Sequence, residues 1–218
     1  MMKTTIKTVT AVLLAVVLCA SLAFLPGCAQ GPSINELYDR VVWLIENSYE
    51  ANVIMFGEGI PVYERGSEIA SLLDIYGTTD GQTAKNYSLA TPALSYLTFE
   101  EMQAGMEKVY SVSYLSKLFN GLFSGAVYEL IDGSSSIEPA RFREEAEGVL
   151  YQLTEYQPLV TGERIYDYAT MEIVGKSSVG HVNVRMNTYK AGDGGKMVPV
   201  VLRLVFERDN WFLDSPTY

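Results

Sequence analysis

Apolar residues recur with helical spacing in the first half of the chain and with strand spacing in the second half. The first helical stretch follows Ser33-Ile34-Asn35-Glu36, a capping box in which Ser33 and Glu36 satisfy each other's free backbone N–H groups. Behind it, one helical face is apolar and consists of Ile34, Leu37, Tyr38, Val41, Leu44, Ile45 and Tyr49. The pattern predicts a helix that begins at this capping box.

Three later stretches also predict helices. Thr98-Phe99-Glu100-Glu101 repeats the capping signal. It opens a helix whose expected apolar residues are Phe99, Met102, Met106, Val109 and Tyr110. A second helix is expected from about Ser113 to Phe123, where apolar residues follow steps of three and four. A short amphipathic helix is expected at Ser67 to Ile75.

Strict alternation of apolar and polar residues replaces the helical pattern towards the end of the chain. Two strands are expected around Val182-Asn183-Val184-Arg185-Met186 and Val198 to Glu207, joined by a glycine-rich turn at residues 191–195. A strand from Ile165 to Val174 precedes them. A turn at Asp209-Asn210 leads into a last strand with Trp211 and Leu213.

Two segments between the helices and these strands are less clear. Residues 141–153 fit either a helix begun at Pro139 or a hairpin turning near Glu147-Gly148. We favour the hairpin because Val149-Leu150-Tyr151 is typical of a strand. The segment from Asp132 to Glu138 resembles a calcium loop, but serines replace the acidic ligands and the loop is too short. We expect a linker turn there.

Helices followed by strands predict an α+β fold, with N-terminal helices packed on a C-terminal curled antiparallel sheet. The sequence contains no internal repeat and no interior linker that demands a second domain. Residues 33–218 are therefore expected to form a single α+β domain.

The N-terminal segment is typical of a signal peptide. Lys3 and Lys7 precede an uninterrupted apolar run at residues 11–20, and the apolar stretch ends at Pro26-Gly27. A transmembrane helix is the competing interpretation, but Val9 to Leu25 is 17 residues long, whereas about 20 are needed to span a bilayer. Residues 1–27 are therefore expected to be removed.

Leu25-Pro26-Gly27-Cys28 resembles the lipobox of bacterial prolipoproteins, with Leu at −3, Gly at −1 and Cys as the first mature residue. Pro26 departs from the Ala or Ser that is commoner at −2. The resemblance implies that the Cys28 sulfur carries a diacylglycerol, and a plain signal peptide is the alternative. Two acyl chains anchor a protein stably, because each buried CH₂ adds about 0.8 kcal/mol. Residues 28–32 would then be the lipidated N-terminus and a short spacer, and the domain would lie outside the cytoplasm on the outer face of the plasma membrane.

Charge and cysteine content limit the chemistry that such a domain can perform. Cys19 lies inside the predicted signal, so acylation of Cys28 leaves no thiol for disulfides, zinc or catalysis. The mature chain of 191 residues, 218 minus 27, would carry 14 Lys+Arg and 26 Asp+Glu, a net charge of −12. This balance argues against nucleic acid. Anionic lipid and anionic wall polymers would repel such a surface, so we expect the domain either to extend away from the membrane or to face a cationic partner.

No residue pattern indicates a catalytic, metal or cofactor site. His181 is the only histidine, it begins a strand on the polar face, and the chain contains no Gly-x-Ser-x-Gly motif. A pair of acids such as Glu58, Glu64, Glu68 or Asp74 would suffice for glycoside hydrolysis, although acids of a solvated surface form such groups by chance. We therefore expect a protein that is not an enzyme and has no cofactor.

The segment from Asn52 to Arg65 loses helical periodicity, and we expect it to be a loop. Its central part, Val53 to Tyr63, combines apolar residues with Gly57 and Gly59. Its apolar residues either pack as core or form an exposed anchor for a partner. The partner-binding residues of such an anchor would be Phe56, Glu58, Ile60, Tyr63 and Glu64.

The C-terminal residues 201–218, from Val201-Leu202-Arg203-Leu204-Val205-Phe206 through Trp211-Phe212-Leu213, resemble the closing hairpin of small exported Firmicutes proteins of NTF2-like or cystatin-like shape. The helical stretch from Glu100 to Ser111 is similar too. Within that group the order of elements resembles IseA-like inhibitors of cell-wall DL-endopeptidases, which are not enzymes. The resemblance implies an envelope-binding function, possible inhibition of a wall hydrolase, and a cleft between helices and sheet. The alternatives are a small-ligand-binding lipoprotein and an acid-pair hydrolase.

Overall fold

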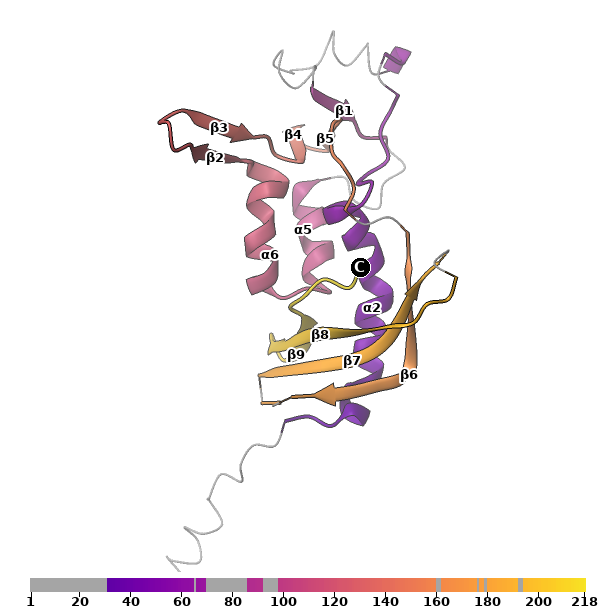
Figure 1. Ribbon diagram of the computed structural model, residues 1–218. Helices are drawn as coiled ribbons and strands as arrows, with labels where there is room; N and C mark the ends of the chain where they lie inside the picture. The colour runs from indigo at the N-terminus through magenta and orange to yellow at the C-terminus, as the bar shows by residue number, and fades with distance from the viewer. Residues whose placement is uncertain are drawn as a thin grey trace, which may run out of the picture.

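The computed structural model describes residues 31–64, 66–69, 86–91, 98–159, 162–175, 177–178, 180–191 and 194–218. The predicted signal and lipobox, with Cys19 and Cys28, lie outside these residues, and so does most of the helix expected at Ser67 to Ile75. The helices and strands form an α+β fold, as predicted (Figure 1).

The long helix α2, Ile34–Phe56, begins at the predicted capping box, where the Ser33 N–H donates to a Glu36 carboxylate oxygen at 2.7 Å. Its buried face consists of Leu37, Val41, Leu44, Ile45, Ala51, Ile54 and Met55. The prediction of a loop from residue 52 onward was wrong for residues 52–56, which complete the helix. Ile54 and Met55 lie on the buried face of the helix.

A four-stranded antiparallel meander packs against α2. It consists of β6 (Arg164–Val174), β7 (His181–Lys190), β8 (Val198–Glu207) and β9 (Asn210–Leu213), in that order. The predicted alternation is confirmed at its centre, where Val182, Val184, Met186, Leu202 and Leu204 are buried. β8 and β9 are joined by Arg208 and Asp209, both with positive φ, which is typical of a two-residue hairpin turn.

Two shorter helices lie beside α2. They are α5 (Phe99–Glu107), capped by the Thr98 hydroxyl, and α6 (Val112–Phe119), capped by Ser111 and continued by a π-helical turn, η1 (Asn120–Ser124). Helix α5 was predicted to reach Tyr110, and it ends instead at Glu107. The backbone of the next residues pairs with β9, since Leu213 N donates to Val109 O and Ser111 N donates to Leu213 O.

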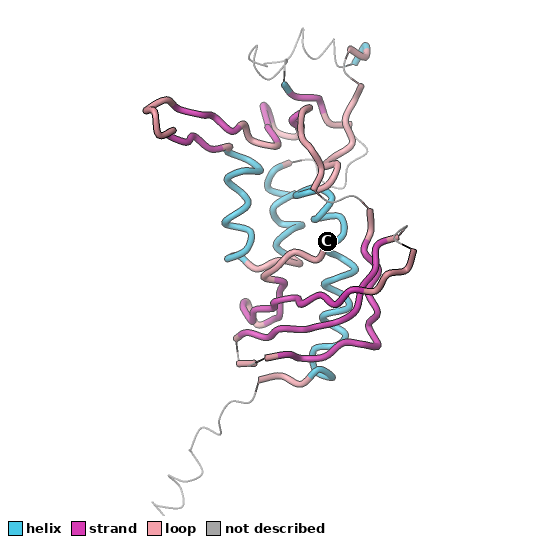
Figure 2. The backbone as a smooth tube through the Cα atoms, viewed as in Figure 1, coloured by secondary structure: helices cyan, strands magenta, loops and turns pink. Residues whose placement is uncertain are grey.

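The remaining strands form two small sheets instead of extending the meander (Figure 2). One sheet has the order β1 (Tyr87–Leu89), β5 (Val149–Leu153), β4 (Phe142–Ala146). The hairpin predicted at residues 141–153 is therefore confirmed, with Gly148 at positive φ in its turn. The other sheet is a hairpin of β2 (Ala126–Glu129) and β3 (Ser135–Glu138). The linker turn expected at residues 132–138 is confirmed at residues 132–134, where Gly133 has positive φ, and was wrong for Ser135–Glu138, which forms a strand.

The last residues of the chain return to the middle of the molecule beside α2 (Figure 1). Thr217 is 3% exposed, and its hydroxyl lies 2.7 Å from the Ser48 hydroxyl and accepts a hydrogen bond from Asn52 Nδ2. The Tyr166 hydroxyl donates to the Thr217 carbonyl. These contacts fasten the tail to both α2 and the four-stranded sheet.

Candidate binding site

The segment from Val53 to Tyr63, which was predicted as an apolar loop, lies largely in the hydrophobic core. Ile54, Met55 and Ile60 are 4%, 2% and 4% exposed, and Phe56 is half-buried against the same hydrophobic core. Ile60, the centre of the proposed anchor, therefore points inward and offers no side chain to a partner. The core alternative explains this part of the segment.

A buried arginine explains why the segment folds inward. Arg141 is 3% exposed, and its guanidinium donates to the carbonyls of Met55 at 2.7 Å and Gly57 at 2.6 Å. It also lies 3.7 Å from the ring centre of Tyr156. The last carbonyls of a helix carry partial negative charge and lack partners within the helix, so a cation there is stabilising. Burial lowers the pKa of Arg141 to about 10, which leaves it charged at neutral pH.

Gln152 closes the turn that follows. Its side chain accepts from Ile60 N at 2.6 Å and donates to Glu58 O at 2.8 Å. Gly59 has φ +87°, and a Cβ at this position would overlap the Gln152 side chain. The glycine thus supplies both the positive φ and the close approach that the turn needs.

The other predicted anchor residues divide by exposure. Tyr63 is half-buried against a small cluster of Tyr87, Leu89 and Tyr151. Glu58 and Glu64 are exposed. A binding role for these two acids stays a prediction, but they do not form an apolar anchor.

The β2–β3 hairpin is where the described residues expose apolar side chains on a projecting element (Figures 1 and 2). Val127 and Ile137 are directly opposite one another in the strand pairing, and they are 70% and 74% exposed. Leu130 and Ile131 in the connecting turn are exposed as well. An isolated two-stranded hairpin is only marginally stable in water. Apolar side chains that stay exposed add no hydrophobic stabilisation to it. Such a surface is typical of an interaction site.

Local contacts shape the hairpin. The Asp132 carboxylate accepts from the Ser134 N–H at 2.9 Å and from its hydroxyl at 2.6 Å, and these bonds hold the pKa of Asp132 below its usual range. Gly125, at φ +72°, precedes β2, and a Cβ there would lie 2.6 Å from Glu138 O. Residues 126–138 carry three acids, Glu129, Asp132 and Glu138, and no basic residue. The hairpin is therefore both apolar and negatively charged.

A groove of about 620 Å³ lies at the base of the hairpin. Its apolar wall includes Phe123, Val127, Ile137, Pro139 and Ala140. On its other side Arg143 lies 4.9 Å from the ring centre of Tyr87, whose hydroxyl donates to Ala140 O at 2.5 Å. The groove joins the hairpin to the β1–β5–β4 sheet and adds one cationic group to the apolar surface.

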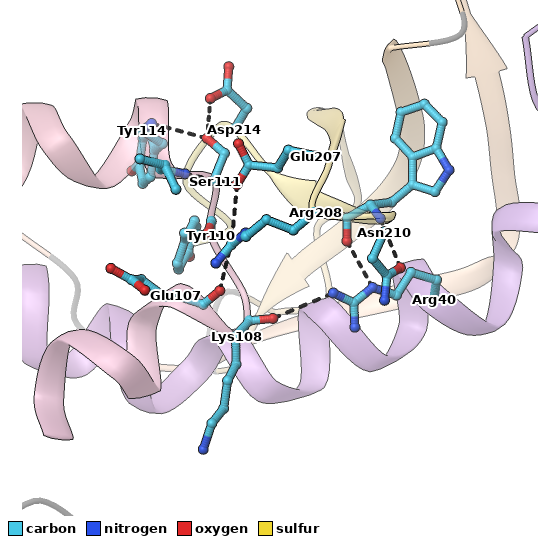
Figure 3. Close-up of polar contacts among 12 residues, drawn as sticks. Arg40, Glu107, Lys108, Tyr110, Ser111, Tyr114, Glu207, Arg208, Asn210 and Asp214 are labelled. Atoms are coloured by element: carbon cyan, nitrogen blue, oxygen red, sulfur yellow. Dashed lines mark hydrogen bonds and ion pairs between the residues drawn. The ribbon is translucent and has the colours of Figure 1, made fainter.

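A polar cluster elsewhere in the molecule is structural (Figure 3). Ser111 is fully buried, its hydroxyl donates to Asp214 Oδ1 at 2.5 Å, and Asp214 pairs with Arg203 at 2.7 Å. Nearby, Arg40 donates to Trp211 O and Arg208 donates to Tyr110 O. Because the Ser111 hydroxyl is inaccessible and already caps α6, it is not placed to attack a substrate. The cluster joins the α5–α6 connection to β9.

The other residues considered for catalysis are on the surface. His181 is exposed at the start of β7, as predicted. Glu58, Glu64 and Glu68 are exposed, while Asp74 lies outside the described residues. Within the described part of the chain, no three His, Cys, Asp or Glu residues are grouped as metal ligands, and no helix is long and apolar enough to cross a membrane.

The β2–β3 hairpin had one sequence signal, a short strand-like run Ala126-Val127-Tyr128 on one side of Asp132-Gly133 and Ser135 to Glu138 on the other. Turn residues between two such runs indicate a hairpin. Three consecutive serines conceal the second strand. No family model matches this sequence, and no curated protein matches it.

Proposed function

We propose that this chain is a bacterial surface lipoprotein whose α+β domain is a binding module without catalytic activity, and that it presents the β2–β3 hairpin to a protein of the cell envelope. The observation that carries the proposal is the exposure of Val127 and Ile137 on a projecting hairpin whose two strands pair with each other (Figures 1 and 2). A hairpin of this kind gains stability when a partner covers its apolar face.

The position of the hairpin suits a tethered binder. Lipidation at Cys28 would anchor the chain only a few residues before Ser33, where α2 begins. A helix of 23 residues is about 34 Å long at 1.5 Å per residue. The hairpin lies towards the opposite end of α2 from Ser33 (Figure 1). The domain would therefore display the hairpin away from the membrane.

The chemistry of the hairpin favours a particular kind of partner. Its three acids favour a basic rim, and its apolar residues favour a cleft into which Val127 and Ile137 fit. Opposite charge raises the association rate more than the affinity. A cell-wall hydrolase with a basic rim around its cleft, such as a DL-endopeptidase, would fit this chemistry, and the hairpin would block it. The packing of α2 across a four-stranded meander supports an NTF2-like or cystatin-like shape as part of the same proposal.

The groove beside Arg143 favours a second candidate, a lipoprotein that binds a small apolar ligand with one acidic group. The exposed acids Glu58, Glu64 and Glu68 give no comparable support to the acid-pair hydrolase.

The hairpin can be tested by replacing its apolar residues with β-branched polar ones. We expect the double variant Val127→Thr/Ile137→Thr to bind wall hydrolases from an envelope extract at least tenfold less tightly, and to lose inhibition of wall digestion. The matched control is Ile165→Thr/Val201→Thr, which changes two apolar residues that are 40% and 52% exposed on β6 and β8.

Equal binding by both double variants would contradict the hairpin as the binding element. Inhibition of the hydrolase that a small apolar acid relieves would favour the groove and the second candidate.

A further inference from the structure

The residues just before α2 line a pocket at the opposite end of this helix from the β2–β3 hairpin (Figure 1). The pocket has a volume of about 810 Å³ and is lined by Gly31, Pro32, Ser33 and Glu36, by Ser177, and by Phe206 and Trp211. It therefore lies between the start of α2 and the β8–β9 hairpin.

The chain is held closely at the first described residue. A Cβ on Gly31 would overlap the Ser177 side chain, so the backbone of residue 31 lies directly against the connection between β6 and β7. Cys28 is three residues earlier. Three Cα–Cα steps of about 3.8 Å limit the distance from Cys28 to Gly31 to about 11 Å. A lipid on Cys28 would thus keep this pocket close to the membrane.

The residues around the pocket suit the membrane interface. Phe206 is 42% exposed, and its ring centre lies 5.3 Å from that of Trp211. Arg40 donates to Trp211 O at 2.8 Å and lies 4.6 Å from the ring centre of Trp43, which is 40% exposed. Aromatic rings with a polar edge collect at the level of lipid headgroups, and arginine extends its charge there.

Charges of both signs surround this surface. Glu207 pairs with Arg208 at 2.9 Å, and an acid with a cationic partner is repelled less by phosphate groups than a free one. Glu36 accepts hydrogen bonds from Ser33 and keeps its charge, which the guanidinium groups of Arg40 and Arg208 on this end of the domain offset. A headgroup region is about 5–8 Å thick on each side of the hydrocarbon core, which is less than the reach of the tether.

We propose that Phe206 and Trp211, with the pocket they line, rest in the headgroup region of the membrane that holds the Cys28 anchor. This inference depends on the proposed lipidation. The contact would fix the orientation of the domain, with the start of α2 at the membrane and the β2–β3 hairpin directed outward.

Tryptophan fluorescence tests the contact directly. The chain has two tryptophans, Trp43 and Trp211, so Trp43→Phe leaves Trp211 as the reporter. In the lipidated protein in phosphatidylcholine vesicles, we expect phosphatidylcholine brominated near the headgroup end of its chains to reduce Trp211 emission at least twofold. Adding Phe206→Ser should weaken this quenching. Vesicle-bound protein whose Trp211 emission is unchanged by the brominated lipid would overturn the contact.

A second preparation separates this inference from the proposed lipidation. Residues 28–218 contain every described helix and strand, and Cys28 is their one cysteine. A maleimide phospholipid can therefore be attached at Cys28 chemically. Quenching of Trp211 in this conjugate supports the contact even when protein from cells lacks the lipid mass. If protein isolated from cells lacks the mass of the lipid, the proposed lipidation is wrong, but the contact is not contradicted. If Trp211 is not quenched in the chemically lipidated protein, the contact is wrong, but the proposed function is not contradicted.

Discussion

Two apolar segments that contain or adjoin glycine differ in where their side chains lie. The segment at residues 53–63 turns inward and buries Ile60 to 4% exposure, whereas the hairpin at residues 126–138 leaves Ile137 at 74%. The first meets Arg141 and Gln152, which satisfy its carbonyls and one N–H group. In the second, the strand pairing and the bonds of Asp132 lie within the hairpin. The presence of distant polar partners, more than apolar content, separates a core segment from a candidate interface.

The difference has an energetic side. A buried helix end needs partners for its last carbonyls, since each unsatisfied polar group costs about 1–3 kcal/mol. Arg141 provides them for α2, so the apolar residues beside it can leave water. The β2–β3 hairpin does not need a distant donor, because the backbone groups at its exposed edges can form hydrogen bonds to water.

The largest expected effect is at Arg141. Arg141→Met retains most of the apolar length but leaves the carbonyls of Met55 and Gly57 without their donor. We expect the free energy of unfolding to fall by about 3–5 kcal/mol, as for loss of one partner of a buried charge contact. Chemical denaturation measures this. Arg143→Met, on the neighbouring half-buried arginine, is the control, and an equal loss in both variants would contradict the special role of Arg141.

The same substitution in both segments tests the contrast next. Ile60→Ala removes buried methyl groups and should lower the free energy of unfolding by about 2–4 kcal/mol. Ile137→Ala should change it by less than about 0.5 kcal/mol, as is usual for exposed sites. Thermal and urea unfolding of the two variants give both values. Similar losses would mean that the hairpin packs against the domain in solution.

The smallest expected effect is that of alkaline pH on the free energy of unfolding, through the buried tyrosine Tyr110. Tyr110 is fully buried, its hydroxyl accepts from Asn52 on α2 at 2.7 Å, and burial raises its pKa to about 12 from an ordinary value of 10. Because the folded pKa is the higher one, the stabilisation is complete below pH 10 and is lost as the pH rises towards 12. We expect this group to account for a loss of about 1 kcal/mol at pH 11.

Urea titrations at pH 8 and pH 11 measure that loss. Tyr110→Phe should reduce the difference between the two pH values, although other buried tyrosines also contribute. An undiminished difference in Tyr110→Phe would show that Tyr110 is not the group that titrates.

Local patterns predicted the regular elements well. The capping box at Ser33, the Thr98 hydroxyl cap, the alternation in β7 and β8, and the Gly148 turn are each determined by neighbouring residues, and each was confirmed. Errors arose where partners far along the chain decide. Helix α2 extends to Phe56, where the side chain of Arg141, 86 positions from Met55, caps its end. The helix of Thr98 ends at Glu107 because the following residues pair with β9.

The candidate site was not predicted. Exposure depends on which segments meet in three dimensions, and the sequence gives no sign that Val127 and Ile137 find no partner within the domain. The Ser-Ser-Ser run hid β3, because serine is weakly associated with strands, and the resemblance to a calcium loop suggested a turn. Lipidation at Cys28, by contrast, depends on a local motif and stays a prediction of the sequence alone.

Arg141 holds α2 through carbonyl oxygens and not through a carboxylate. Carbonyls do not take up protons in the acidic range, and a guanidinium whose pKa is about 10 keeps its charge there. The joint between the long helix and the small sheet therefore has no acid-labile component. Acid that protonates carboxylates would therefore leave this connection unchanged.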